Sequence, residues 1–509
     1  MEGVVVKKIS IVVLFGLMVA PGSMLGAEQS VDIEALKREL RELKQRTQDL
    51  EKKLEQIELS GGAGTANIVS NGSTNRSNAL PSTAHPEAPA QPSAPAPDEG
   101  MVAPGNPAVA EVPEVGAPNA WSPTQPIGIG SSKNFINISL DALMAAGSST
   151  ANDIEALEPG GHDPKQRGFT IQNLETTFDG KIDPYLRGQA NIVMQITPQG
   201  ETTLEAEEAY LETMSLPWNL QLKAGQFLTE FGRLNATHPH AWDFVDQPLV
   251  NARLLGPEGL RNPGARLSWL APTPFYSELL FAVQNSQGET AHSFRSDHED
   301  NLFFGRPTTL GEFHNTGDLL FVPRYVASFD LSDSQTIMAG ASAAFGPNGT
   351  GENTDTQIYG ADLFYKWKSP RQHGGYPFVT WQTEAMLRRY EAGAFDGDAA
   401  LRIPALPNET LRDYGFYSQV AYGFRKGWVG AFRVDYVAPY ERSFYETVLG
   451  PDPDRTSRWR LSPNLTWYPS EFSKVRLQYN YDHRNQIGDD HSVWMQVEFL
   501  LGAHAAHKF

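Results

Sequence analysis

The chain contains no cysteine, and this absence removes several kinds of chemistry at once. Without a thiol there is no cysteine nucleophile, zinc–thiolate site, iron–sulfur cluster or disulfide framework. Positive charge is scarce too: 41 Lys and Arg stand against 60 Asp and Glu, giving a formal net charge of −19 over 509 residues. A nucleic-acid-binding protein needs a basic footprint against the phosphates, so we expect no nucleic-acid partner.

Long apolar runs are missing outside the first 27 residues. A bundle of membrane helices needs runs of about 18 apolar residues, so that class is excluded. A membrane β-barrel is not excluded, because its apolar residues alternate with polar ones. The sequence also lacks G-x-S-x-G, P-loop and H-E-x-x-H motifs, and no Ser–His pair suggests a membrane phospholipase. We therefore expect no enzyme.

The N-terminus has the features of an export signal. Lys7 and Lys8 precede an apolar stretch over 9–20, and small residues lead to Ala27. This order predicts a signal peptide over 1–27, with an uncleaved membrane anchor as the alternative.

A heptad repeat follows, within a predicted coiled coil over 30–59. Its a positions hold Ile33, Leu40, Thr47 and Leu54, and its d positions hold Leu36, Leu43, Leu50 and Ile57. Oppositely charged g and e residues favour identical parallel helices, so we expect self-association. The heptads do not decide between dimer and trimer, and a lone amphipathic helix is the alternative. Residues 60–132 are rich in Gly, Ser, Ala and Pro, which predicts a disordered linker.

From residue 133 to 509 the dominant pattern has a period of two. In the segment 473–484, Val475, Leu477 and Tyr479 alternate with Arg476 and Gln478. Such alternation predicts strands with one apolar and one polar face. We expect sixteen strands, near 134–145, 168–180, 185–197, 201–214, 218–228, 263–271, 275–285, 320–331, 335–345, 356–368, 377–390, 413–425, 428–437, 456–468, 473–484 and 491–502.

The connections alternate between short turns and long segments at 229–262, 286–318, 391–412 and 438–455, and Tyr and Trp cluster at strand ends. Both features are typical of outer-membrane barrels. The predicted fold class is therefore all-β: a transmembrane antiparallel β-barrel of about sixteen strands, with fourteen or eighteen as alternatives. A soluble β-sandwich or β-helix is the rival architecture.

One segment carries a family resemblance. Residues 222–227 (LKAGQF), continuing to 230–235 (EFGRLN), resemble the G-Q-F-x-x-x-F-G segment of the phosphate-selective porin O and P family. The resemblance covers about 133–509 and implies a sixteen-stranded, trimeric porin of the Gram-negative outer membrane. It does not imply phosphate, because a Lys- and Arg-rich entrance is not evident. Residues 237–248 are similar to chains described as zinc-regulated outer-membrane receptors.

Several charged residues are candidates for lining the pore. Glu205 and Glu207 lie on an acidic strand, although its lumen phase is hard to assign. The segment 229–262 contains Arg233, Arg253 and Arg261, which would act as constriction cations if this loop folds inward. The C-terminal strands contribute Arg433, Arg458, Arg460, Arg476 and Arg484. A basic wall facing an acidic wall would set charge selectivity, whereas ordinary solvation and pairing is the alternative.

Histidines beside carboxylates suggest a second kind of chemistry. His238, His240 and Asp243 lie in one long loop, and His292 and His298 lie in the next. Imidazole with carboxylate suits Zn²⁺, so zinc is the cofactor to consider, although a His-x-His in a loop is more often structural.

These observations favour an exported outer-membrane porin, forming homotrimers, for passive diffusion of small hydrophilic solutes or anions. The coiled coil and linker would lie in the periplasm, where the coil could contact the cell wall. The alternatives are a zinc-linked outer-membrane receptor with little open conductance, and a structural tether between membrane and cell wall. An energy-coupled receptor is disfavoured, because the region before the first strand is low-complexity rather than a plug domain.

Overall fold

The computed structural model describes residues 127–130, 135–295, 302–308, 313–351, 353–398, 403–452 and 455–502. The predicted signal peptide and coiled coil, most of the predicted linker, and His298 lie outside these residues.

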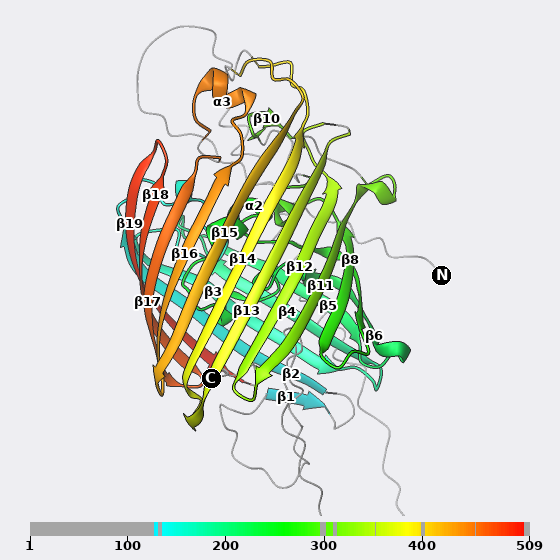
Figure 1. Cartoon of the computed structure of the whole chain (residues 1–509), viewed down its shortest axis with the longest axis vertical. Helices are drawn as coiled ribbons and strands as arrows, with labels where there is room; N and C mark the ends of the chain where they lie inside the picture. Colours follow the sequence, from blue (N-terminus) through cyan, green and yellow to red (C-terminus); the bar gives the residue numbers. More distant parts are fainter. Residues whose placement is uncertain are drawn as a thin grey trace, which may run out of the picture. The chain divides into compact units, whose positions relative to one another are not determined.

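Sixteen strands form a closed antiparallel barrel (Figure 1). Neighbours in the chain pair with one another, β8 pairs with β11, and β19 pairs with β2 to close the ring. The strands are β2 (Phe135–Ser149), β3 (Gly168–Lys181), β4 (Leu186–Ile196), β5 (Thr202–Thr213), β6 (Leu220–Leu228), β7 (Arg261–Leu270), β8 (Tyr276–Asn285), β11 (Leu319–Ser332), β12 (Gln335–Pro347), β13 (Asp355–His373), β14 (Tyr376–Ala392), β15 (Glu409–Arg425), β16 (Trp428–Pro439), β17 (Arg458–Ser470), β18 (Ser473–Arg484) and β19 (Gly488–Leu501). The sixteen predicted strands are confirmed, several of them longer than expected.

Three further strands are short: β1 (Ile127–Gly130) pairs with the start of β2, and β9 (Leu302–Phe303) pairs with β10 (Arg306–Pro307). The helices α2 (Leu249–Leu255) and α3 (Phe444–Leu449) lie in long loops. Single 3₁₀ turns occur at η1 (Glu155–Leu157), η2 (Pro217–Asn219), η3 (Pro239–Ala241), η4 (Glu289–Ala291) and η5 (Thr316–Asp318). No helix among the described residues has the length and hydropathy needed to cross a membrane.

The long connections all emerge from one end of the barrel. The chain runs up β2, β6, β8, β14 and β16 into them, whereas the opposite end has turns as short as 333–334 and 426–427. The two ends therefore differ as the sequence predicts.

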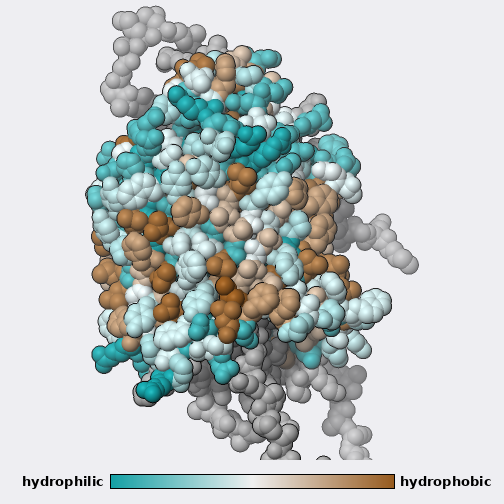
Figure 2. Space-filling view, in the orientation of Figure 1, coloured by the Kyte–Doolittle hydropathy of each residue, from teal (hydrophilic) through white to brown (hydrophobic). Residues whose placement is uncertain are grey.

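Each strand presents two chemically different faces. On β15, Tyr414, Phe416 and Tyr422 are exposed on the outside, while Asp413 and Gln419 are buried inside. On the face shown in Figure 2, apolar side chains gather across the middle of the barrel, with hydrophilic side chains above them at the loop end. A polar interior and an apolar exterior are the reverse of a soluble β-sandwich.

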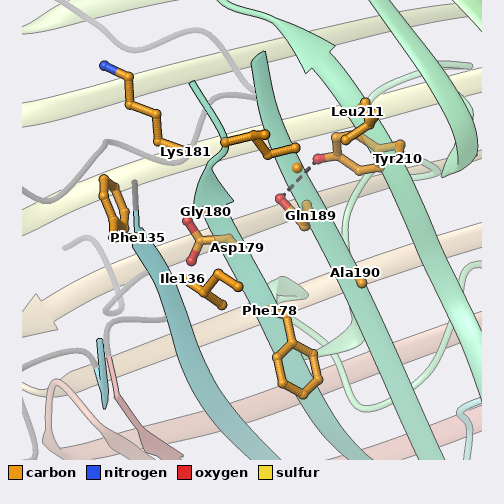
Figure 3. A pocket seen from close by; sticks show the side chains of 12 residues that line it. Phe135, Ile136, Phe178, Asp179, Gly180, Lys181, Gln189, Ala190, Tyr210 and Leu211 are labelled. Atoms are coloured by element: carbon orange, nitrogen blue, oxygen red, sulfur yellow. Dashed lines mark hydrogen bonds between the residues drawn. The ribbon is translucent and has the colours of Figure 1, made fainter. Parts of the chain in front are cut away.

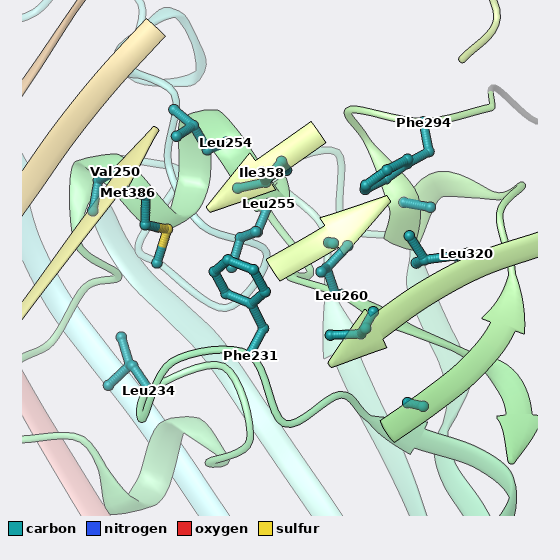
Figure 4. Close-up of a cluster of buried hydrophobic side chains, with 14 of the residues drawn as sticks. Phe231, Leu234, Val250, Leu254, Leu255, Leu260, Phe294, Leu320, Ile358 and Met386 are labelled. Carbon is teal, nitrogen blue, oxygen red and sulfur yellow. The ribbon is translucent and has the colours of Figure 1, made fainter. Parts of the chain in front are cut away.

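The loop between β6 and β7, residues 229–260, folds into the barrel, and we call it the plug loop. Its apolar side chains pack on inward-facing apolar residues of β8 and of β11 to β16. Figure 4 shows part of this cluster, with Phe231 and Leu255 near Ile358 of β13. Phe231 is fully buried among them, and α2 contacts β14, β15 and β16. The inward course of this loop, which the sequence suggests, is thus observed. The apolar patch on the lumen wall is unexpected, because simple alternation predicts a polar interior.

Two glycines of the G-Q-F-x-x-x-F-G segment have steric roles. A Cβ on Gly225 would lie 2.2 Å from the carbonyl oxygen of Ala209, so only glycine permits this approach of β6 to β5. Gly232 has a φ of +61°, and its Cβ would lie 2.1 Å from a carboxylate oxygen of Glu384. These two glycines therefore lie where the chain leaves the barrel wall at the end of β6 and turns into the lumen.

A β-bulge on β5 changes which side chains face the lumen. Asn191 of β4 pairs with Glu208 and Ile192 pairs with Ala206, which leaves Glu207 as an extra residue. Both Glu207 and Glu208 are consequently buried inside, although they are neighbours in sequence. This bulge is the reason that the lumen phase of the acidic strand is hard to read from the sequence.

Candidate functional site

The plug loop is fixed to the lumen wall by Asp246. Its carboxylate accepts hydrogen bonds from Arg433 (2.7 Å), Arg460 (2.9 Å), Gln478 (2.7 Å) and Asn480 (2.8 Å). Charge-assisted bonds in a buried setting are strong, so this single side chain ties the loop to β16, β17 and β18.

Four arginines of the C-terminal strands are buried inside the barrel, namely Arg433, Arg458, Arg460 and Arg476, and three of them are paired with acids. Arg433 also contacts Asp435, and Arg458 and Arg460 both contact Asp482, each within 2.6–2.7 Å. Burying these guanidinium groups is tolerable only because carboxylates face them.

The remaining arginines of this wall have neutral partners. Arg476 donates to Thr466, Gln496 and the carbonyl oxygen of Trp242, and within the described residues no carboxylate forms an ion pair with it. Arg484 donates to the carbonyl oxygen of Ala156 at the mouth of the barrel.

The three predicted constriction cations do not share one environment. Arg253 of α2 pairs with Glu158 at 2.7 Å, and Arg261 pairs with Glu205. Arg233 lies 3.8 Å from the ring centre of Phe364 and donates to Gln382 at 3.1 Å. Of the three, Arg233 alone is without an ion pair among the described residues.

His238 and His240 meet a set of buried carboxylates where the plug loop contacts β2, β3 and β5. The rings are stacked with centroids 5.6 Å apart. His238 contacts Glu207 through Nδ1 and Glu208 through Nε2, each at 2.9 Å. Nδ1 of His240 lies 3.1 Å from Asp141 and 3.5 Å from Glu175.

His162, from the loop between β2 and β3, extends this set. Its Nε2 lies 3.3 Å from Glu207 and 3.5 Å from Glu258. Burial would lower the pKa of His162, but the charge of Glu258 and the contact with Glu207 outweigh burial and raise the pKa to about 10. Burial is likewise outweighed at His240, where Asp141 and Glu175 raise the pKa to about 10.

Two other predicted metal ligands are placed elsewhere. Asp243 accepts a hydrogen bond from Gln419 at 3.2 Å, and neither of the His–carboxylate groups includes it. His292 stacks edge-on against Phe303, with centroids 5.0 Å apart. The sequence does not predict that Asp141, Glu175 and His162 belong to this set. They are distant in sequence from the plug loop, and only closure of the barrel brings them close to it.

Two hollows accompany these features. One of about 410 Å³ at the loop end has a mixed lining, with charged side chains such as Glu158, Arg253 and Arg388 beside apolar ones such as Phe303 and Phe304. The other, of about 490 Å³, lies near the short-turn end of β2 to β5 (Figure 3). Its lining is mostly apolar and includes the outward-facing Ile136 and Leu211, so it belongs to the outer surface rather than to the lumen.

The architecture defines a class. A closed antiparallel barrel with an apolar belt outside and buried polar side chains inside is how a protein crosses a bilayer with β-strands. The chain is a transmembrane β-barrel.

Comparison with known proteins adds a family. The chain is 31% identical over 372 residues to an uncharacterised protein of Aquifex aeolicus (strain VF5), covering 69% of this chain and 73% of that protein. It therefore belongs to the same family as the Aquifex protein. No protein-family model matches the chain.

Solved structures with low similarity include two bacterial barrels. The outer-membrane channel DcaP of Acinetobacter baumannii is 11% identical, with a TM-score of 0.49 over 73% of this chain and 99% of that chain. OprB of Pseudomonas putida is 10% identical, with a TM-score of 0.43 over 72% and 94%.

Proposed function

We propose that the protein is a porin of the Gram-negative outer membrane that lets small hydrophilic solutes diffuse passively through its lumen. The observation that carries this proposal is the closed barrel itself, whose inward faces are polar along most strands. The hollow of about 410 Å³ at the loop end, which contains both charged and apolar side chains, would receive the solute. The plug loop would narrow the route of the solute through the lumen. Four of its residues are not fully buried: Ala241 is exposed, and Arg233, Trp242 and Asp243 are half-buried.

The proposal includes a mild preference for anions. Arg433, Arg458 and Arg460 are neutralised by acids, so they contribute little net field to a passing ion. Arg233 and Arg476 are not paired with carboxylates among the described residues, and they would favour negatively charged solutes. We further propose that the protein forms homotrimers, in keeping with its resemblance to trimeric porins.

A planar bilayer recording under a KCl gradient tests this function. We expect stepwise openings in groups of three and a reversal potential of the sign set by chloride. Arg233→Gln should move the reversal potential toward that of potassium, while Arg412→Gln, which alters an exposed ion pair on the outer rim, should not. If the folded, heat-modifiable barrel showed no conductance, the proposed porin function would be overturned.

A second candidate function is an outer-membrane receptor for a divalent cation, with little open conductance. The His–carboxylate groups between the plug loop and the wall favour it. It predicts saturable cation binding that is lost when His238 and His240 are replaced together. The role of a tether stays a prediction, because the coiled coil lies outside the described residues.

A further inference from the structure

Two groups of metal-ligating side chains share one residue in the lumen. Asp141, Glu175 and His240 form the first group, and Glu175, Glu207 and His238 form the second. In each group, one ligand atom from every residue lies within 4.8 Å of the others. The three carboxylates come from β2, β3 and β5, whereas both histidines come from the plug loop, so each group joins the loop to the wall.

Glu175 is oriented for a bridging role. Its Oε1 accepts a hydrogen bond from Thr177 at 3.0 Å and another from Asn191. Its Oε2 lies 3.5 Å from Nδ1 of His238 and also 3.5 Å from Nδ1 of His240. Oε2 also accepts a hydrogen bond from Asn173 at 3.2 Å, so neighbouring donors orient the whole carboxylate with this oxygen between the two rings, as in metal sites whose ligands are oriented by surrounding hydrogen bonds.

Asp141 gives independent support. Its side chain is only 2% exposed, yet neither carboxylate oxygen has a hydrogen-bond partner. Its Oδ2 is 3.1 Å from Nδ1 of His240, so a ligand atom of the wall and a ligand atom of the plug loop face each other directly. Burying this carboxylate is costly unless a positive charge compensates it, and a metal ion bound by both atoms would supply that charge.

The lumen around the two histidines contains more acidic than basic side chains. Lys474 pairs with Glu498, whereas Arg261 pairs with Glu205 and also lies 3.7 Å from Glu207 and 3.8 Å from Glu258. The carboxylates of Asp141, Glu175, Glu207 and Glu208 remain beside His238 and His240. With Glu205 and Glu258 included, six carboxylates face four basic side chains, which are Arg261, His162, His238 and His240, so bound divalent cations would compensate an acidic excess.

We propose that the lumen binds two divalent transition-metal cations, bridged by Glu175, which clasp the plug loop to the barrel wall. Each ion has three protein ligands of mixed imidazole and carboxylate type, a set suited to Zn²⁺ that leaves a coordination position open. This inference deepens the receptor function proposed above and does not depend on whether the barrel conducts.

Metal stoichiometry tests the proposal directly. The full mature chain, prepared without a histidine tag, is stripped with a chelator, dialysed against Zn²⁺ and analysed for metal per folded barrel. We expect two tightly bound Zn²⁺ ions, and Mg²⁺ should not displace them. Glu175→Gln should weaken Zn²⁺ binding at both positions by about 10-fold or more. The matched control Glu205→Gln, a carboxylate of β5 outside both groups, should keep two ions.

Fewer than two ions in the unaltered chain would overturn the proposal, as would equal binding by the Glu175 and Glu205 variants. If Glu175→Gln does not fold, Asp141→Asn should retain a single ion, and retention of both would contradict the assignment. Resistance of the plug loop to protease should rise with Zn²⁺ in the unaltered chain and in the Glu205 variant, but not in the Glu175 variant. Zn²⁺ binding without conductance would support the metal site and overturn the porin function. Conductance without Zn²⁺ binding would support the porin function and overturn the metal site.

Discussion

At the scale of single residues, the plug is held by steric fit as much as by charge. Gly360 faces inward on β13, directly beneath the ring of Phe231. A Cβ at Gly360 would lie 2.8 Å from Cε1 and 3.0 Å from Cζ of that ring. The absence of a side chain on the wall therefore creates the space that the aromatic residue of the loop fills.

Replacing Gly360 with Ala should loosen the plug loop. The added methyl group must displace Phe231 from a packed core, which costs about 1–3 kcal/mol. We expect a lower temperature for the heat-induced gel-mobility shift and faster proteolysis within 229–260. Gly430→Ala is the matched control, since its Cβ would meet only Cε1 of Phe424, at 3.9 Å. Equal behaviour of the two variants would show that Phe231 does not depend on this space.

At the scale of elements, the long loops lie over one another at the mouth. Glu158, at the end of η1, pairs with Arg253 of α2 at 2.7 Å and with Arg458 of β17 at 3.2 Å. The loop between β2 and β3 is thereby attached both to the plug and to the wall. Asp246 has the corresponding role for the plug loop, and both attachments depend on ionised carboxylates.

The attachment of the β2–β3 loop should depend on pH. Burial raises the pKa of Glu158, but the charges of Arg253 and Arg458 outweigh burial and hold the pKa below its usual 4.5. A lowered folded-state pKa stabilises the attachment above pH 4.5, and this stabilisation is lost as the pH falls further. Protease cleavage within 150–167 should therefore increase below pH 4.5. Glu158→Gln should raise cleavage at neutral pH and abolish this contribution to the pH dependence.

Removing the charge of Asp246 should release the plug loop. Asp246→Asn leaves Arg433 and Arg460 with weaker compensation in a buried site, at a cost of about 3–5 kcal/mol. We expect larger and noisier single-channel currents than in the unaltered chain. Glu441→Gln removes an ion pair in which both side chains are more than one-third exposed, and it should leave the currents unchanged. Identical currents from all three proteins would show that the plug loop does not limit conduction.

At the scale of the whole molecule, the barrel depends on its apolar belt. Leu477 lies near the middle of β18 and is 54% exposed on the outer face. A charge there would lie in the hydrocarbon layer, because the neighbouring outward residues are apolar as well. The hydrocarbon layer of the membrane thus requires both the apolar belt and the closed ring of strands.

Leu477→Arg should impair membrane assembly. An arginine at mid-bilayer depth on a barrel exterior costs about 2–4 kcal/mol. We expect a smaller heat-modifiable fraction after refolding into lipid vesicles and a lower urea midpoint. Leu477→Ala, which removes bulk without adding charge, should lose much less. If Leu477→Arg assembled as well as the unaltered chain, this part of the outer surface would not lie in the hydrocarbon layer.

The sequence predicts the strands closely because period-two alternation is a local property. Val475 to Tyr481 on β18 show it without any reference to the rest of the chain. The His–carboxylate groups could be predicted only in part. His238 and His240 were recognised from their spacing, but Asp141 and Glu175 lie on separate strands that only ring closure and loop insertion bring to them. Alternation also fails at Glu207, where the bulge inserts one residue and moves the following side chains to opposite faces.

Because of this bulge, the carboxylate of Glu207 can be lost from the lumen without a change in which barrel strands pair with one another. Loss of the single codon for Glu207 would restore regular pairing, with Ala206 still outward and Glu208 still inward. Such a deletion would remove the carboxylate shared by His162 and His238 while leaving the faces of all other β5 residues unchanged. Relatives could therefore gain or lose this ligand in one evolutionary step, and the length of the β5 segment in each relative would record which had occurred.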